Sequence, residues 1–189
     1  MSSPLIHYII AGARIGIRRP TAEDCDAFVA AVARSVDLHV PWVNPPSTPE
    51  QFAVYLKSRQ SPLEDGFLVC ELASGKIAGL INLNCIVRGS LQSAYLGYYA
   101  MRPFAGRGFM REGLSLVMRH AFGEMQLHRL EANIQPENAA SIALVKGLCF
   151  RKEGFSPRYL LVGGEWRDHA YSYCNPRPRM PSRWRCKGR

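Results

Sequence analysis

Two glycines and two arginines stand where an apolar, strand-like segment passes into a long amphipathic one, as Gly106, Arg107, Gly108 and Arg111. Backbone N–H groups at a helix start lack partners and the helix dipole is positive there, so such a turn favours a phosphate group. The glycines open the backbone to close approach, and the arginines add full charges. The sequence therefore predicts a phosphate site, with an ordinary tight strand–helix turn as the alternative. The segment is neither a Walker loop nor a complete dinucleotide fingerprint.

A second polar pair, Asn138 and Ser141, stands at another expected strand-to-helix junction. Asparagine is a good helix N-cap, and a serine in the first turn is often simply solvated. The spacing of three also allows both side chains to lie near one face of the helix. An amide and a hydroxyl would then both reach one elongated ligand.

The elements that would position these residues follow from hydrophobic periodicity and turn signals. Antiparallel strands come first and a strand-helix-strand-helix unit follows, which indicates an α+β fold with a mixed, mostly antiparallel sheet. The segment 39–49 holds four of the 13 prolines and is expected to be a loop. We expect seven strands, at 14–19, 66–72, 76–87, 93–101, 129–134, 151–161 and 165–174, and four helices, near 24–35, 49–60, 108–125 and 139–148.

The 189 residues suffice for one domain with its own core, which we place at residues 1–174. The net charge of +9 favours anionic partners. Residues 175–189 carry six basic residues and no acidic one. We expect this tail to be flexible; it either contacts RNA or the ribosome, with Trp184 stacking on bases, or merely aids solubility.

Features of secreted, membrane and metal-binding proteins are not expected. No run of about 18 apolar residues occurs, and no basic residue precedes the short apolar run near the N-terminus. The six cysteines have no zinc-like spacing, so we expect reduced thiols and no metal. These features predict a cytoplasmic protein without a membrane contact.

Taken together, the two junctions resemble those of the GNAT acetyltransferase superfamily, and within it the chain resembles the RimJ/RimL group of ribosomal-protein N-terminal alanine acetyltransferases. The resemblance runs from about residue 14 to 174. Its most specific pieces are VRGSLQSAYLGYYAM (87–101), GRGFMREGL (106–114), HRLEANIQPENAAS (128–141) and FRKEGFSPRYLLVGGEWRDHA (150–170).

The resemblance implies the GNAT fold, with acetyl-CoA held in a V-shaped gap between the strands at 93–101 and 129–134. A neutral amine would attack the thioester directly while a backbone N–H polarises its carbonyl. Asn138 would contact the pantetheine arm and Ser141 would lie near the sulfur. The other implied cofactor contacts are Tyr98, Tyr99 and Ala100 along the pantetheine arm, and Gly106, Arg107, Gly108, Phe109, Met110 and Arg111 at the pyrophosphate.

Several roles within this scheme are open. Val145 stands where many members of the superfamily have an acidic tyrosine, so Ser141 is our candidate for hydrogen bonding the departing thiolate. Glu131 is a candidate relay to a general base, or an ordinary ion-paired strand residue. Trp42 and Trp166 are candidate walls of the acceptor entrance.

The resemblance implies transfer of an acetyl group to a primary amine, with the α-amine of a ribosomal or other protein as the expected acceptor. One alternative is a small amine such as an antibiotic, a polyamine or an amino acid. A second is a non-catalytic module that binds CoA or RNA. Whether the protein is a monomer or a homodimer is open.

Overall fold

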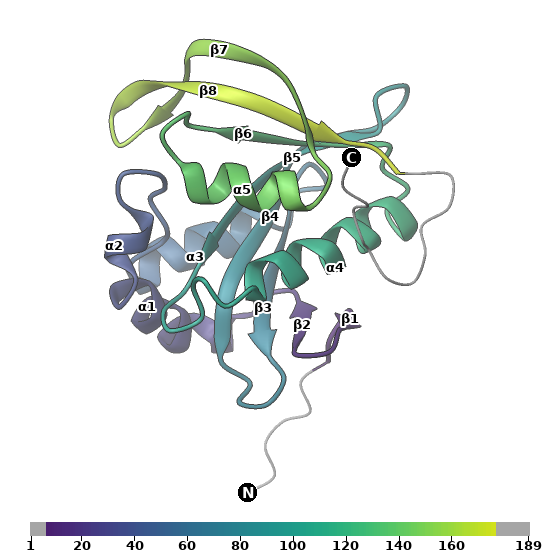
Figure 1. Ribbon diagram of the computed structural model, residues 1–189. Coiled ribbons are helices and arrows are strands. Elements are labelled where there is room, and N and C mark those ends of the chain that lie inside the picture. Colours follow the sequence, from purple (N-terminus) through teal and green to yellow (C-terminus); the bar gives the residue numbers. More distant parts are fainter. Residues whose placement is uncertain (1–6, 177–189) are drawn as a thin grey trace, which may run out of the picture.

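An open sheet of eight strands forms the centre of the molecule (Figure 1), in the order β1-β2-β3-β4-β5-β6-β8-β7. The structure is a computed structural model, of which residues 7–176 are described. Neighbouring strands are antiparallel except β5 and β6, which are parallel. The strands are β1 (Ile10–Ala11), β2 (Ile15–Arg18), β3 (Asp65–Glu71), β4 (Ile77–Val87), β5 (Ser93–Ala100), β6 (Arg129–Ile134), β7 (Arg151–Val162) and β8 (Glu165–Cys174).

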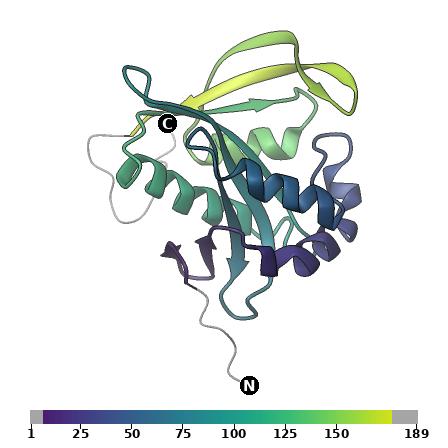
Figure 2. The ribbon, with the colours of Figure 1, turned by 180° about the vertical axis from the view of Figure 1, so that it is seen from behind.

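Helices cover both faces of this sheet. In Figure 1, α4 and α5 lie in front of it, and the reverse view in Figure 2 brings α1 and α3 forward. The helices are the 3-10 turn η1 (Ala22–Asp24), α1 (Cys25–Ala33), α2 (Val36–His39), α3 (Pro49–Ser58), α4 (Phe109–Gly123) and α5 (Ala139–Gly147). The result is a three-layer arrangement with a core on each side of the sheet.

The two cores follow from the alternation of side chains along the central strands. On β3, Phe67 and Val69 belong to the core beneath α4, whereas Leu68 and Cys70 belong to the core beneath α1 and α3. All four are fully buried, as a central strand covered on both faces requires. This continuous burial explains why the segment reads as an unbroken apolar run.

Local sequence signals define the starts of α5 and α3. At α5, the Asn138 side chain accepts a hydrogen bond from Ser141 N–H at 3.0 Å, so the expected N-cap is confirmed. At α3, Thr48 caps Gln51 N–H and Pro49 occupies the first helical position. The helix after loop 39–49 therefore begins at Pro49, as expected, and ends at Ser58, two residues before the expected end.

The expected order of elements is confirmed, and two short elements were missed. Strand β1 has two residues and α2 has one turn. Neither is long enough to show a period of 2 or 3.6 residues, so hydrophobic patterning carries no signal for them. Strand β1 is held by pairing with β2, and α2 by contacts to the end of β5 described below.

The remaining expectations meet the structure only in part. Among the described residues, no helix is long and apolar enough to cross a membrane. Cys25, Cys70 and Cys85 are free thiols, as expected. Cys149 is disulfide-bonded, so the expectation of a reduced thiol is wrong there, because scattered spacing carries no information on pairing. The part of the basic tail from 177 to 189 lies outside the described residues.

Candidate active site

Strands β5 and β6 run side by side at one end and then part. Their parallel pairing extends from Ser93 opposite Arg129 to Leu96 opposite Ala132. Beyond that point β5 continues to Ala100 paired with β4, and β6 continues to Ile134 paired with β8. The sheet therefore opens between the two strands after residue 96.

Backbone groups of β5 point into this opening at alternate residues. Gln92 carbonyl accepts from Arg129 N–H at 3.1 Å on the β6 side, whereas Met101 N–H donates to Ala78 carbonyl at 2.9 Å on the β4 side. Even-numbered residues of β5 thus face β6 and odd-numbered ones face β4. Tyr98 and Ala100 accordingly direct their N–H and C=O groups into the gap, where β6 no longer pairs with them.

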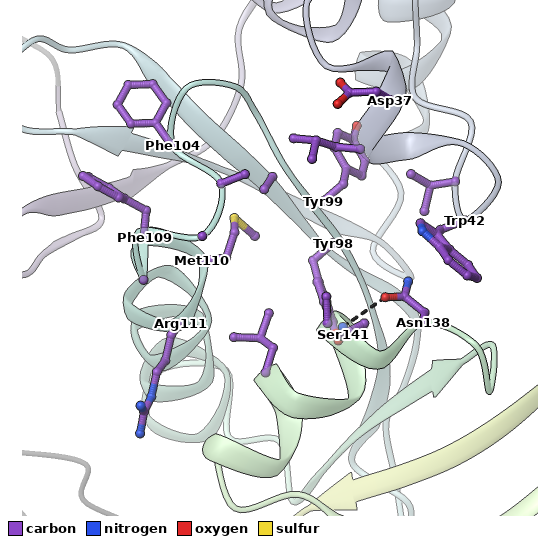
Figure 3. Close-up of a pocket in the computed structure, with 18 residues that line it drawn as sticks. Asp37, Trp42, Tyr98, Tyr99, Phe104, Phe109, Met110, Arg111, Asn138 and Ser141 are labelled. Carbon is purple, nitrogen blue, oxygen red and sulfur yellow. Dashed lines mark hydrogen bonds between the residues drawn. The ribbon is translucent and has the colours of Figure 1, made fainter.

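A cavity of about 540 Å³ lies at this opening (Figure 3). Its walls come from the open end of β5, the α2 region, the turn before α4 and the first turns of α4 and α5. The lining residues are Asp37, Leu38, Trp42, Val43, Tyr98, Tyr99, Ala100, Phe104, Ala105, Gly106, Gly108, Phe109, Met110, Arg111, Asn138, Ala140, Ser141 and Leu144.

The start of α4 forms the cationic end of the cavity. Gly106 and Gly108 have φ of 74° and 80°, a left-handed conformation that strongly favours glycine. The first-turn N–H groups of Phe109, Met110 and Arg111 lack intrahelical acceptors, as at any helix start. Arg111 also donates from Nη2 to Gly147 carbonyl at 3.1 Å, which ties its guanidinium to the end of α5.

Arg107 is placed differently from Arg111. Its guanidinium carbon lies 5.2 Å from the centre of the Phe109 ring and 6.0 Å from that of Phe104. Its side chain is exposed and does not line the cavity, whereas its carbonyl accepts from Arg14 Nη1 at 3.1 Å. The Arg107 side chain thus packs against the turn.

Two hydroxyl groups meet at the centre of the cavity. The Tyr98 hydroxyl lies 2.6 Å from Ser141 Oγ, and Asn138 orients the serine through its backbone N–H (Figure 3). Burial raises the pKa of Tyr98 to about 12, although the bond to Ser141 opposes that rise. Sequence reasoning assigned Tyr98 a backbone role alone. No sequence signal places its side chain beside Ser141, which is 43 positions away in the chain.

Two other predicted residues lie away from the cavity. The Glu131 carboxylate accepts from Arg129 Nε at 2.8 Å, in the part of β6 that still pairs with β5. Trp166, on β8, is 56% exposed and does not line the cavity. Trp42 does line it, and its carbonyl accepts from Gln135 Nε2 at 3.4 Å. Within the described part of the chain, no three metal-ligating side chains cluster.

Residues that the sequence did not single out connect α2 to the open end of β5. His39 is 2% exposed, and its Nε2 lies 2.9 Å from the Ala100 carbonyl. Since a carbonyl can only accept, Nε2 carries the hydrogen. Ser35 Oγ, also buried, accepts from Arg102 N–H at 2.9 Å. The α2 wall of the cavity is therefore anchored to the strand that opens.

An open mixed sheet whose two parallel strands part beside a glycine-started helix defines the fold class of the acyl-CoA N-acyltransferases. A family model described as an acetyltransferase (GNAT) domain matches residues 14–151, and the chain belongs to this family.

Relatives and solved structures agree with that assignment. The chain is 33% identical over 115 residues to the probable N-acetyltransferase YjcK of Bacillus subtilis, covering 61% of this chain and 64% of the relative. It is 40% identical over 94 residues to the [ribosomal protein uS5]-alanine N-acetyltransferase of Escherichia coli, covering 50% and 48%. The matches thus span about half to two thirds of these relatives. The structure of Mycobacterium smegmatis RimJ in complex with CoA-disulfide superposes with a TM-score of 0.79 at 26% identity, covering 85% of this chain and 81% of that one.

Proposed function

We propose that this protein transfers an acetyl group from acetyl-CoA to a primary amine, and that the acceptor is the N-terminal α-amine of a protein, such as a ribosomal protein. The parting of β5 and β6 over the start of α4 carries the proposal, because it exposes unpaired strand backbone beside a helix start. The relative from E. coli named for ribosomal protein uS5 supports the choice of acceptor. This acceptor places the proposed reaction in the cytoplasm.

The described residues fit acetyl-CoA along the length of the cavity. Pantetheine carries amide groups, and the gap-facing N–H and C=O groups of Tyr98 and the N–H of Ala100 are the partners that such amides need, whereas the Ala100 carbonyl already accepts from His39. The N–H groups at the start of α4 and the Arg111 guanidinium would bind the diphosphate. Gly106 and Gly108, both in the left-handed conformation, place no side chain of their own beside these N–H groups. Asn138 and Ser141 line the same cavity from the start of α5.

The catalytic part of the proposal rests on Tyr98 and Ser141. A gap-facing N–H of β5 would donate to the thioester oxygen as that oxygen gains charge, which is a preorganised form of electrostatic stabilisation. Ser141 Oγ would hydrogen bond the departing thiolate. The Tyr98 phenol, the more acidic of the two hydroxyls, would supply the proton through Ser141.

The amine acceptor would enter from the α2 side. Trp42, Leu38 and Val43 provide an apolar wall there, opposite the helix start that would hold the phosphates. Trp166 and Glu131 lie outside the cavity, so the proposal gives them no direct contact with the reacting atoms.

The test is to incubate purified protein with acetyl-CoA and an alanine-starting peptide, and to measure free thiol release. Small amines, including a polyamine and an aminoglycoside, are assayed in parallel. We expect thiol release with the peptide to exceed that with any small amine. If a small amine is acetylated faster than the peptide, that small amine is the acceptor and the peptide is not. CoA binding without thiol release from any amine would reject the enzymatic proposal.

A further inference from the structure

The cavity carries two opposite charges on different walls. Among its described lining residues, Arg111 is the one cationic side chain and Asp37 the one anionic side chain. Arg111 belongs to the first turn of α4, whereas Asp37 belongs to α2, and the two lie apart in Figure 3. In the proposed function, the Arg111 end of the cavity binds the diphosphate of acetyl-CoA. The Asp37 end therefore faces the space left for the acceptor.

Asp37 is held in place by its neighbours on both sides in the chain. Two residues before it, buried Ser35 accepts from Arg102 N–H at 2.9 Å and donates to Ala31 carbonyl at 2.6 Å. Two residues after it, His39 donates to the Ala100 carbonyl at 2.9 Å. These contacts fix α2 to the residues that end β5, so the backbone of Asp37 has a defined position beside the gap.

The present partner of Asp37 is easily exchanged. Arg102 binds both carboxylate oxygens of Asp37, with Nε 3.3 Å from Oδ1 and Nη2 bonded to Oδ2. Both side chains are more than half exposed, at 59% for Asp37 and 53% for Arg102, and exposed ion pairs contribute little to stability. Arg102 also lowers the pKa of Asp37, so the carboxylate is charged at neutral pH.

We propose that Asp37 binds the ammonium group of the incoming acceptor, and that Arg102 is the partner which this ammonium replaces. The inference rests on the proposed function and adds the residue that recognises the amine acceptor in its protonated form. Trp42 lines the cavity on the same side in Figure 3, and an aromatic ring beside a cation site can add to its attraction. Recognition precedes transfer: the bound ammonium then releases its proton to water, and the neutral amine attacks the thioester.

The experiment compares three variants with the amine that the wild-type protein acetylates fastest. Asp37→Asn removes the charge while keeping the shape, and we expect the KM for the amine to rise about tenfold with the KM for acetyl-CoA unchanged. Arg102→Gln removes the competing cation, and we expect the KM for the amine to fall. Val36→Ala is the matched control, since Val36 lies on α2, is 55% exposed and does not line the cavity.

The opposite directions expected for Asp37→Asn and Arg102→Gln distinguish recognition from a structural role, because loss of a purely structural ion pair would affect both variants alike. An unchanged KM for the amine in Asp37→Asn, with an active wild-type protein, overturns this inference alone. A parallel rise in both variants, or a rise in the KM for acetyl-CoA, also overturns it. If Asp37→Asn does not fold, Arg102→Gln still decides, since an unchanged or higher KM for the amine contradicts the proposal. A wild-type protein that acetylates no amine removes the proposed function and this inference with it.

Discussion

The Tyr98 hydroxyl lies 2.6 Å from Ser141 Oγ, so β5 and α5 meet through two hydroxyl groups at the centre of the cavity. Each group has one further anchor. Tyr98 belongs to a strand paired with β4, and Ser141 N–H donates to the capping Asn138 side chain. The pair is therefore held by two elements that come from distant parts of the sequence.

Loss of the phenol should reduce turnover without loss of cofactor. We expect Tyr98→Phe to lower kcat by about tenfold to a hundredfold, because the proton supply to the thiolate is removed while the ring still packs. Affinity for CoA, measured by calorimetry, should be unchanged.

The double variant Tyr98→Phe with Ser141→Ala then tests whether the two hydroxyls act together. Residues that act as one unit give a double variant little worse than the worse single variant. Effects on kcat that multiply would show that the hydroxyls act independently, and an unchanged kcat in Tyr98→Phe would remove the phenol from the mechanism.

The glycine turn before α4 should depend on its backbone conformation. Gly108 is the N-cap of α4 with φ of 80°, and an alanine there must adopt a left-handed conformation. We expect Gly108→Ala to lower the free energy of unfolding by about 1–2 kcal/mol and to weaken CoA binding. Urea unfolding and calorimetry measure the two effects.

Gly123→Ala is the matched control for that substitution. Gly123 is the last residue of the same helix, and an added methyl group there meets no atom within 4 Å. The Gly123→Ala variant should have a free energy of unfolding and an affinity for CoA no lower than those of the wild-type protein. Equal losses in the two variants would contradict a specific role for the turn at Gly108.

Local features of the site were predictable from sequence and its long-range contacts were not. The turn at Gly106 and Gly108 and the cap at Asn138 depend on residues within a few positions of each other, so residue type and spacing suffice. The bonds of Tyr98 to Ser141 and of His39 to Ala100 join residues 43 and 61 positions apart. Only the folded topology brings such residues together, and one sequence carries no record of it.

The same limit explains the residues that lie elsewhere. Glu131 lies on one of the two strands that part, yet it belongs to the segment that is still paired and forms an ion pair with Arg129. Where two strands separate depends on register, and the hydrophobic pattern of β5 and β6 does not encode the last paired residue. The seven expected strands and four expected helices, in contrast, follow directly from period and turn residues.

Stability should fall in mild acid because of His120 on α4. Its ring is buried against Phe67, and neither nitrogen has a hydrogen-bond partner among the described residues. Burial, with a smaller effect of Arg19, lowers the pKa of His120, while Asp65 and Glu124 oppose this more weakly. The unfolded chain then binds this proton more readily than the folded one.

The sign of the effect follows from that difference. The contribution of His120 is fully present above the usual histidine pKa of about 6.5 and is lost as the pH falls below it, by at most about 1.4 kcal/mol per pH unit. Urea unfolding at several pH values measures this slope. His120→Gln cannot titrate and should have a shallower slope than the wild-type protein between pH 7 and pH 5. Identical slopes would show that other groups cause the acid sensitivity.

The bond between His39 and Ala100 should influence catalysis more than cofactor affinity. The His39 Nε2 hydrogen holds the gap-facing carbonyl of Ala100, two residues beyond Tyr98 on β5. In His39→Ala this carbonyl is released, so the end of the strand and the α2 wall lose a shared anchor. We expect kcat to fall about tenfold, since a small displacement of the groups around the thioester is costly, while the diphosphate contacts at α4 remain and preserve most of the affinity for CoA. His39→Gln retains an N–H donor and should recover part of the loss, because the wild-type contact depends on an N–H that donates to the Ala100 carbonyl. A glutamine variant as slow as the alanine variant, or a loss confined to CoA affinity, would show that His39 does not position the strand for transfer.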